Sequence, residues 1–460
     1  MKTATITDKD KGVALFVAVM ASFLAPFVGS SVSIALPSIA GEFNLDAITL
    51  GWVVTAYLLA AAIFLVPFGK LADIKGRKKI FTYGIIIDAV SSIGAALSPS
   101  GGLLIAFRLL QGVGGAMIFG TGVAIVTSIF PLAERGKALG INAAATYIGL
   151  SVGPPASGLL TQYLGWRSIF ALDALIGLII IIAVFWRLKG EWTGAEGEKF
   201  DAAGSVIYGL ALLGIMYGFT LLPDISGFAL VGIGLGALAL FIFRENRIKN
   251  PVLSMELFKR SMVFSMSNLA ALINYSATFA ISFLLSLYLQ YIKGYSPETS
   301  GLILVLQPVM MAVLSPIAGR LSDRIQPQWI ATAGMALTTF GLGMMIFLDQ
   351  NTQLDFIMAA LIIVGLGFGL FSSPNTNAVM SSVDKNYYGV ASGTLATMRL
   401  VGQMLSVGIV MLMFALFIGQ VEITPANYPL FLVSSKMAFI VFTVLCFAGI
   451  FASLARGKSR

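Results

Sequence analysis

Residues 69–78 read GKLADIKGRK and residues 319–324 read GRLSDR, so one pattern of glycine, acid and basic residues occurs twice, 250 positions apart. Each copy separates two long apolar runs. At about 31 residues for a membrane-spanning helix and its turn, this interval holds eight helices. The duplication therefore predicts two related six-helix halves with two further helices inserted between them.

The composition is that of a membrane protein. Of the 460 residues 58% are apolar and 11% are charged, whereas soluble domains have about 25% charged residues. A spanning helix needs about 20 apolar residues, and fourteen runs of about this length occur. Their approximate bounds are 13–36, 50–69, 80–98, 103–130, 139–163, 168–187, 203–221, 227–243, 262–291, 300–319, 328–347, 355–381, 390–418 and 434–454.

The basic residues predict the orientation of these spans. With the N-terminus inside, all but five of the 29 Lys and Arg residues fall on the cytoplasmic side. The exceptions are Arg167, Lys293 and Lys436 outside and Arg108 and Arg399 within spans. An asymmetry of this kind is typical of the positive-inside rule and places both termini in the cytoplasm. It also explains the net charge of +8 without a nucleic-acid partner.

Several function classes are excluded by the residues that the chain lacks. It has no histidine, and its one cysteine, Cys446, lies in an apolar run. Disulfides, zinc sites and catalysis by histidine or cysteine are therefore not expected. The first apolar run is too long for the core of a signal peptide and is expected to remain as the first span. The longest segments between spans, 188–202 and 244–261, are too short for a soluble domain.

These motifs resemble the fourteen-helix drug:proton antiporter branch of the major facilitator superfamily, the EmrB/QacA group, over nearly the whole chain. The resemblance rests on the first loop, on residues 108–112 (RLLQG) and on residues 149–158 (GLSVGPPASG), which are similar to the antiporter signature. It implies an all-α membrane fold with an N-terminal six-helix bundle (1–187), linker loops and two extra helices (188–261) and a C-terminal six-helix bundle (262–460). It also implies a monomeric exporter in the cytoplasmic membrane with H⁺ as the coupling ion and no other cofactor.

The two loops are the predicted gate on the cytoplasmic side. Asp73 is expected to cap the start of the third span and to pair with Arg77. The resemblance implies that this cluster latches the two halves together; the simpler interpretation is that its charges only obey the positive-inside rule. The predicted gating residues are Gly69, Asp73, Gly76, Arg77, Gly319, Asp323 and Arg324.

In span five, small residues and two prolines predict close helix packing and a bend. The residues concerned are Gly149, Gly153, Pro154, Pro155 and Gly158. Ordinary tight packing and a gating role both agree with this pattern.

Charged residues inside spans are the strongest candidates for a transport pathway, since each costs about 2.5–3.5 kcal/mol unless paired or hydrated. Arg108 and Asp173 enter their spans to the same depth, which allows a buried ion pair. Asp88 is a candidate proton site. Arg399 is a candidate solute site, because the second half of the chain has no acidic residue at the same depth in the membrane. The predicted pathway residues are Arg108, Gln111, Asp88, Asp173, Arg399, Gln403, Asn274 and Gln307.

The chain departs from the family pattern in its first span. Related antiporters carry an acid there, and this chain has Val28. Proton coupling is therefore in question, and two intramembrane arginines favour neutral or anionic solutes over lipophilic cations. The alternative function is an uncoupled exporter of a metabolite or lipid. An enzyme is not expected, because the chain lacks a catalytic cluster. A fixed channel is not expected either, because it would not explain the duplicated loops.

Overall fold

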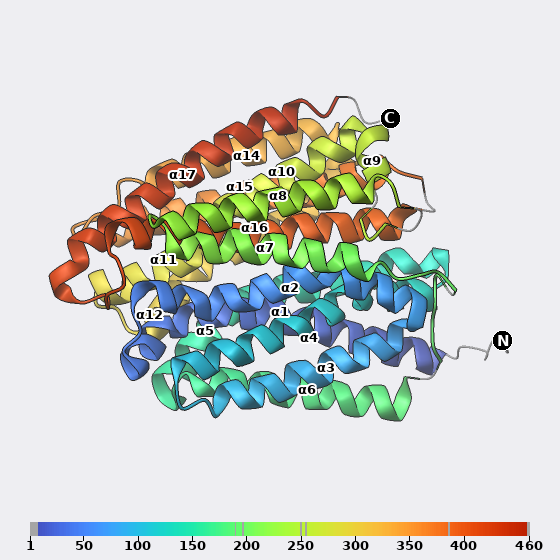
Figure 1. The fold of residues 1–460 in the computed structure, drawn as a ribbon, viewed down its shortest axis with the longest axis horizontal. Coiled ribbons are helices and arrows are strands. Elements are labelled where there is room, and N and C mark those ends of the chain that lie inside the picture. Colours follow the sequence, from blue (N-terminus) through green and yellow to red (C-terminus); the bar gives the residue numbers. More distant parts are fainter. Residues whose placement is uncertain are drawn as a thin grey trace.

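The computed structural model describes residues 8–188, 190–195, 197–248, 251–253, 255–384 and 387–457, and these form helices joined by short loops (Figure 1). Lys2, Lys189, Lys249, Lys385, Lys458 and Arg460, which contribute to the predicted orientation, lie outside the described residues. The first described helix begins, and the last one ends, at the same end of the molecule, on the right of Figure 1. We call this the terminal end and the opposite one the far end.

Six helices form the first half of the molecule, which we call the N-half. They are α1 (Asp8–Phe43), α2 (Ala47–Lys75), α3 (Arg77–Ala96), α4 (Gly101–Ile129), α5 (Leu132–Leu164) and α6 (Arg167–Arg187). Asp46 and Ser100 cap the starts of α2 and α4 by accepting hydrogen bonds from first-turn N–H groups. Within the N-half α1 packs on α5, α4 on α2 and α3, and α6 on α3.

The second half, the C-half, contains broken helices. Its elements are α9 (Met255–Arg260), α10 (Met262–Thr278), α11 (Ile281–Leu287), the π-helical turn η1 (Tyr288–Ile292), α12 (Pro297–Leu304), α13 (Leu306–Ser322), α14 (Pro327–Met345), α15 (Leu354–Ser381), α16 (Tyr388–Phe417), the 3₁₀ turn η3 (Pro425–Asn427) and α17 (Tyr428–Leu454). The break between α12 and α13 precedes Pro308, which has no N–H to donate to the carbonyl of Leu304. At the break between α10 and α11, the Ser406 hydroxyl accepts from the N–H of Ala280 at 3.0 Å.

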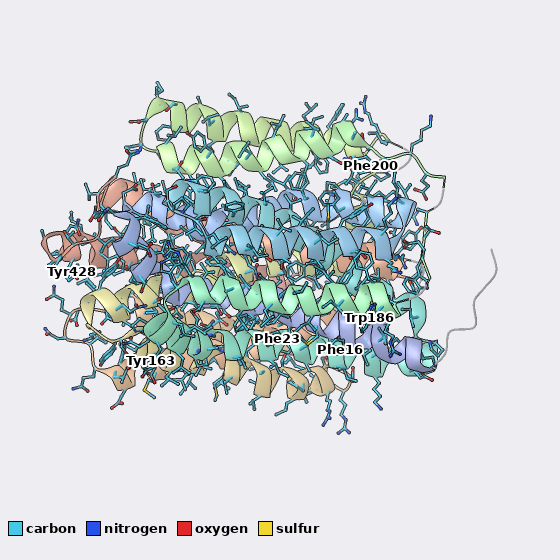
Figure 2. All side chains as sticks on the ribbon, turned by 90° about the horizontal axis from the view of Figure 1, so that it is seen from below. Phe16, Phe23, Tyr163, Trp186, Phe200 and Tyr428 are labelled. Carbon is cyan, nitrogen blue, oxygen red and sulfur yellow. The ribbon has the colours of Figure 1, made fainter. Side chains whose placement is uncertain are left out.

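Helices α7 (Ala202–Leu221) and α8 (Ile225–Glu245) form the inserted hairpin. In Figure 2 this hairpin lies along one side of the molecule, and α7 packs on α2 of the N-half and α16 of the C-half. The Tyr208 hydroxyl donates to the carbonyl of Ala62, and the side chain of Met216 lies against Gly408. The hairpin therefore covers the seam between the two halves.

The two halves are joined mainly toward the far end. There α5 packs on α12, α1 on α11 and α2 on α16. Gln290 donates to the carbonyl of Ile34 at 2.9 Å, and the Tyr163 hydroxyl donates to Glu298 at 3.0 Å. Nearer the middle, the hydroxyls of Tyr147 and Ser315 lie 2.9 Å apart. Contacts of this kind form a closure between the halves at the far end.

The structure confirms an all-helical membrane fold but leaves the number of spans open. Among the described residues, 12 helices are long and apolar enough to cross a membrane. Helices α5 and α14, counted as spans from the sequence, are outside this set because glycine, threonine, serine and asparagine dilute their apolar content. Both pack alongside the spanning helices, α5 on α1 and α14 on α15. Fourteen spans therefore remain a prediction.

Candidate functional site

A buried polar network lies inside the N-half. The side chains of Arg108, Gln111 and Asp173 are at most 1% exposed. Arg108 donates to the carbonyl of Val53 at 3.0 Å and to the amide oxygen of Gln111. Gln111 in turn donates to Asp173 at 2.7 Å, and Ser92 donates to the same carboxylate oxygen at 2.5 Å. The described residues thus connect α3, α4 and α6 through a chain of hydrogen bonds.

This network corrects the expected ion pair. Arg108 and Asp173 form no direct salt bridge, because the amide of Gln111 lies between them and makes a hydrogen bond to each. The guanidinium of Arg108 also lies over the ring of Tyr57, 4.7 Å from its centre. Their partners all belong to α2, α3, α4 and α6. The arrangement therefore fixes the inside of the N-half rather than facing the C-half.

Asp88, like Asp173, has a carboxylate oxygen without a hydrogen-bond partner among the described residues. It is 5% exposed, and its Oδ2 has no hydrogen-bond partner among the described residues. Its backbone packs against Gly114 of α4, where a Cβ would lie 2.8 Å from the Asp88 nitrogen. A buried ionisable side chain with an oxygen left without a donor remains a candidate pathway residue.

The first of the two predicted gating loops is tied to α4 and to the linker after α6. Arg77 pairs with Asp73, with Nη2 and Oδ1 2.7 Å apart, and donates to the Ser128 hydroxyl at 2.7 Å. The pairing agrees with the sequence prediction, but the expected cap does not. Asp73 lies within α2, and the start of α3 is capped by Glu191, which accepts from the N–H groups of Lys78 and Lys79 at 2.8 and 3.2 Å.

Gly76 has a specific reason to be glycine. Its φ of 115° is a conformation that side chains rarely adopt, and a Cβ there would lie 2.4 Å from the Glu191 carboxyl carbon. Gly69, by contrast, has open space around it. The glycine at position 76 thus permits both the turn between α2 and α3 and the approach of the linker.

The second loop is held differently. Asn377 of α15 donates to the hydroxyl of Ser322 at 3.0 Å and to the carboxylate of Asp323 at 3.3 Å. Gly319 packs against Ser373, whose hydroxyl oxygen would be 2.7 Å from an added Cβ. Arg324 is exposed. Each loop is thus attached to the second helix that follows it in the chain: Arg77 joins the first loop to α4, and Asn377 joins the second loop to α15.

The glycines of α5 make close contacts on two sides. Added Cβ atoms at Gly149 and Gly153 would lie 2.5 Å from the carbonyl of Phe23 and 1.9 Å from the Ser30 hydroxyl of α1. At Gly158 an added Cβ would lie 2.6 Å from the carbonyl of Pro297 in the C-half. α5 continues through Pro154 and Pro155 as one helix. Its small residues therefore set the distance both within the N-half and across to the C-half.

The α12 side of this contact is equally close. A Cβ at Gly301 would lie 2.3 Å from the carbonyl oxygen of Pro154. Gly301 and Gly158 thus form a reciprocal close approach of two helix backbones.

In the C-half the charged candidate is Arg399 of α16. Its Nη2 donates to the hydroxyl of Thr376 at 2.6 Å, and its guanidinium lies 5.7 Å from the ring centre of Tyr275. The Tyr275 ring makes an edge contact with Phe368 at 5.2 Å. Arg399 Nε has no partner among the described residues. A cation with one neutral acceptor and an aromatic neighbour can bind an anionic or carbonyl oxygen.

The other C-half candidates lie on three different helices, α10, α13 and α16. Asn274 is fully buried with both amide atoms unpartnered, and Gln307 has an unpartnered oxygen in the part of the chain that the structure describes. Gln307 packs by its backbone against Gly365, whereas Gln403 is half-buried beside Gly402. These three residues have polar side chains that are buried or half-buried, and the described residues show no common pocket that joins them. The sequence analysis missed Thr376 and Tyr275, which carry no charge that would distinguish them.

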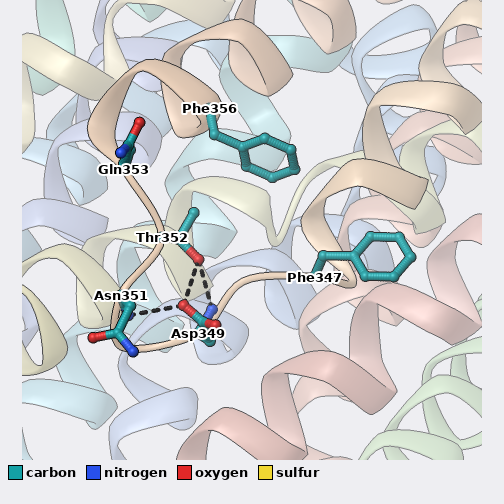
Figure 3. Close-up of a pocket in the computed structure, with 6 residues that line it drawn as sticks. All are labelled: Phe347, Asp349, Asn351, Thr352, Gln353 and Phe356. Atoms are coloured by element: carbon teal, nitrogen blue, oxygen red, sulfur yellow. Dashed lines mark hydrogen bonds between the residues drawn. The ribbon is translucent and has the colours of Figure 1, made fainter.

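The hollow shown in Figure 3 is a surface feature at the far end, where α14 turns into α15. Asp349 accepts there from Thr352 at 2.9 Å and from the N–H of Asn351 at 2.8 Å, and these hydrogen bonds hold the pKa of the carboxyl below its usual value. The hollow thus belongs to a hydrogen-bonded turn away from Arg399. Its lining residues are Phe347, Asp349, Asn351, Thr352, Gln353 and Phe356.

Known proteins are similar to this chain in sequence or in fold. The family model described as Major Facilitator Superfamily matches residues 18–407. Riboflavin transporter RibZ of Clostridioides difficile is 30% identical over 445 residues, which cover 96% of each chain. Multidrug resistance protein Stp of Mycobacterium tuberculosis is 30% identical over 380 residues, 81% of this chain and 70% of that protein. The crystal structure of a bacterial homologue of the human lysosomal transporter Spinster, in an inward-facing and unoccupied conformation, has a TM-score of 0.72 at 16% identity, covering 99% of each chain.

Proposed function

Since the chain belongs to the Major Facilitator Superfamily, we propose that it is a secondary active exporter of small amphipathic solutes that works by alternating access. Family membership makes it a multi-pass membrane transporter of small molecules rather than an enzyme. The proposal places it in the cytoplasmic membrane as a monomer, with the terminal end in the cytoplasm. In the proposed mechanism the two halves, residues 1–187 and 262–460, rock about a solute site that lies between them.

The observation that carries the mechanism is the closure at the far end. The backbones of α5 and α12 meet there at Gly158 and Gly301 without intervening side chains. A contact between small surfaces can separate without unpairing charges or leaving large cavities, so it is suited to a gate. In the proposed cycle this gate opens when the loops at residues 69–78 and 319–324 close the terminal end.

The solute is proposed to be neutral or anionic. Arg399 has an unpartnered guanidinium nitrogen beside the Tyr275 ring, a combination that favours a planar solute with an oxygen acceptor. The relative named as a riboflavin transporter supports a flavin-like solute, and the one named as a multidrug resistance protein supports a drug. Both classes therefore belong in a first panel.

Coupling to protons is the finer part of the proposal, together with placement in the EmrB/QacA group. The residues that support it are Asp88, with its unpartnered oxygen, and Asp173. Val28 at the place of the usual acid favours the alternative, an uncoupled or differently coupled exporter of an anionic or neutral metabolite or lipid. Dependence of flux on an imposed pH gradient distinguishes the two.

The test is solute flux in proteoliposomes with and without a pH gradient, for the wild type, Arg399→Ala and Arg399→Lys. Arg247→Ala is the matched control, because Arg247 is an exposed arginine beyond the end of α8. We expect flux of an anionic or neutral solute to fall strongly in Arg399→Ala and to be retained in the control. Efficient ethidium export that needs the pH gradient and is lost in Asp88→Asn would contradict the solute class while supporting the proton site. Absence of flux for every solute would contradict the exporter itself.

A further inference from the structure

Arg456, at the terminal end of the C-half, is a buried cation to which the described residues offer no hydrogen-bond or ion-pair partner. It follows the end of α17 and is 1% exposed. None of its three guanidinium nitrogens has a hydrogen-bond acceptor among the described residues. Burial lowers its pKa to about 9, so the group is still charged at neutral pH. A buried charge of this kind requires an anion, and the described part of the chain supplies none.

The start of α14 lies beside the end of α17. Gln328 donates to the carbonyl of Leu454 at 2.7 Å, and the hydroxyls of Thr332 and Ser453 lie 2.8 Å apart. The residue before α14, Gln326, makes no side-chain hydrogen bond to the helix start. The uncapped positive end of this 19-residue helix therefore packs beside the residues that directly precede Arg456.

The surroundings indicate which anion would reach this place. The guanidinium lies 5.9 Å from the ring centre of Phe371, and Trp329 in the first turn of α14 is 59% exposed. An exposed tryptophan at the end of a span is typical of the membrane interface, where lipid headgroups lie. Basic pockets between spans on the cytoplasmic side are suited to anionic headgroups.

We propose that Arg456 and the start of α14 bind the phosphate group of an anionic phospholipid from the leaflet at the terminal end. The guanidinium would donate to the phosphate oxygens as a fork, and the helix end would add its positive potential. A zwitterionic lipid carries its own ammonium group beside the phosphate and is expected to bind less well. This site is separate from Arg399 and does not depend on the proposed solute.

The experiment compares the full-length protein in nanodiscs of phosphatidylcholine alone with nanodiscs that contain increasing phosphatidylglycerol. Thermal unfolding is measured for the wild type, Arg456→Gln, Arg456→Lys and the control Arg247→Gln. Native mass spectrometry then measures how much phosphatidylglycerol each variant retains. One arm adds inorganic phosphate to the phosphatidylcholine nanodiscs.

We expect phosphatidylglycerol to raise the unfolding temperature of the wild type and of the control. In Arg456→Gln the apparent affinity of the protein for phosphatidylglycerol should fall at least about fivefold. This fold-change corresponds to the loss of roughly 1 kcal/mol, the usual contribution of one basic residue at an anionic membrane surface. Arg456→Lys should retain part of the response. An equal response in Arg456→Gln, or the same stabilisation by inorganic phosphate, would overturn the lipid site. If Arg456→Gln does not fold, the wild type is compared with Arg456→Lys instead. Equal stabilisation of these two proteins by phosphatidylglycerol, relative to phosphatidylcholine, would then overturn the lipid site.

Discussion

The close contact between α5 and α12 predicts that one added methyl group opens the far end. In Gly301→Ala the new Cβ would lie 2.3 Å from the carbonyl oxygen of Pro154, whereas ordinary contacts begin at about 3.4 Å. The two backbones must therefore move apart by about 1 Å. Overpacking of this kind costs about 1–3 kcal/mol. The far-closed state should thus lose about 5- to 150-fold in population relative to a far-open state, in which the contact is absent.

The matched control is Gly140→Ala in the terminal half of α5. Its added Cβ would meet nothing within 4 Å. Both substitutions raise intrinsic helix stability by about 1 kcal/mol, so a difference between them reports the clash alone.

Distances between spin labels measure this change. Cys446 is the one native cysteine and is first replaced by alanine. A far-end pair at Leu97 and Phe347 (75% and 73% exposed) and a terminal-end pair at Trp186 and Trp329 (79% and 59% exposed) follow the two ends. In Gly301→Ala the far-end distances should lengthen and the terminal-end distances shorten. Unchanged distance distributions in a folded Gly301→Ala protein would refute the gate.

The remaining predictions concern the N-half and are measured on purified protein. Asp173→Asn removes the charge that balances Arg108 in a buried network and should cost about 3 kcal/mol in thermal unfolding. Asp88→Asn should leave stability within about 1 kcal/mol, because no hydrogen bond to its unpartnered Oδ2 is lost, while abolishing the response of flux to a pH gradient; a response equal to the wild type would exclude Asp88 as the proton site. Glu191→Gln should weaken the cap of α3 by about 0.5–1 kcal/mol and speed proteolysis of the linker at 190–195. Arg77→Gln should reduce flux with less than about 1 kcal/mol of destabilisation, since its pair with Asp73 is partly exposed.

Hydropathy and charge predict most of the helices because the bilayer imposes a length and a polarity on each one. The predicted run at 227–243, for example, lies within α8 (Ile225–Glu245). The inserted position of the hairpin also follows from the spacing of the two loops. The packing of this hairpin against α2 and α16 could not be predicted from the sequence. Met216 and Gly408, which are in contact, are far apart in the chain, and nothing in the sequence indicates that they pair.

Site geometry was less predictable, because it depends on how helices are rotated about their axes. Equal depth correctly placed Arg108 near Asp173 but did not show that Gln111 lies between them. The cap of α3 shows the same limit, since Glu191 is separated from Lys78 by 113 residues. Local spacing favoured Asp73 for that role, and the long-range contact determined the outcome.

The two halves differ in how their buried arginine and amide side chains are satisfied, and this difference suggests a division of roles. In the N-half, Arg108, Gln111 and Asp173 hydrogen-bond one another, so a solute that entered would have to replace strong existing partners. In the C-half, Arg399 and Asn274 retain unpartnered nitrogen atoms. Unpaired buried groups are costly unless a ligand or water completes them. Solute recognition is therefore expected to depend more on the C-half, while the N-half provides the rigid body against which it moves.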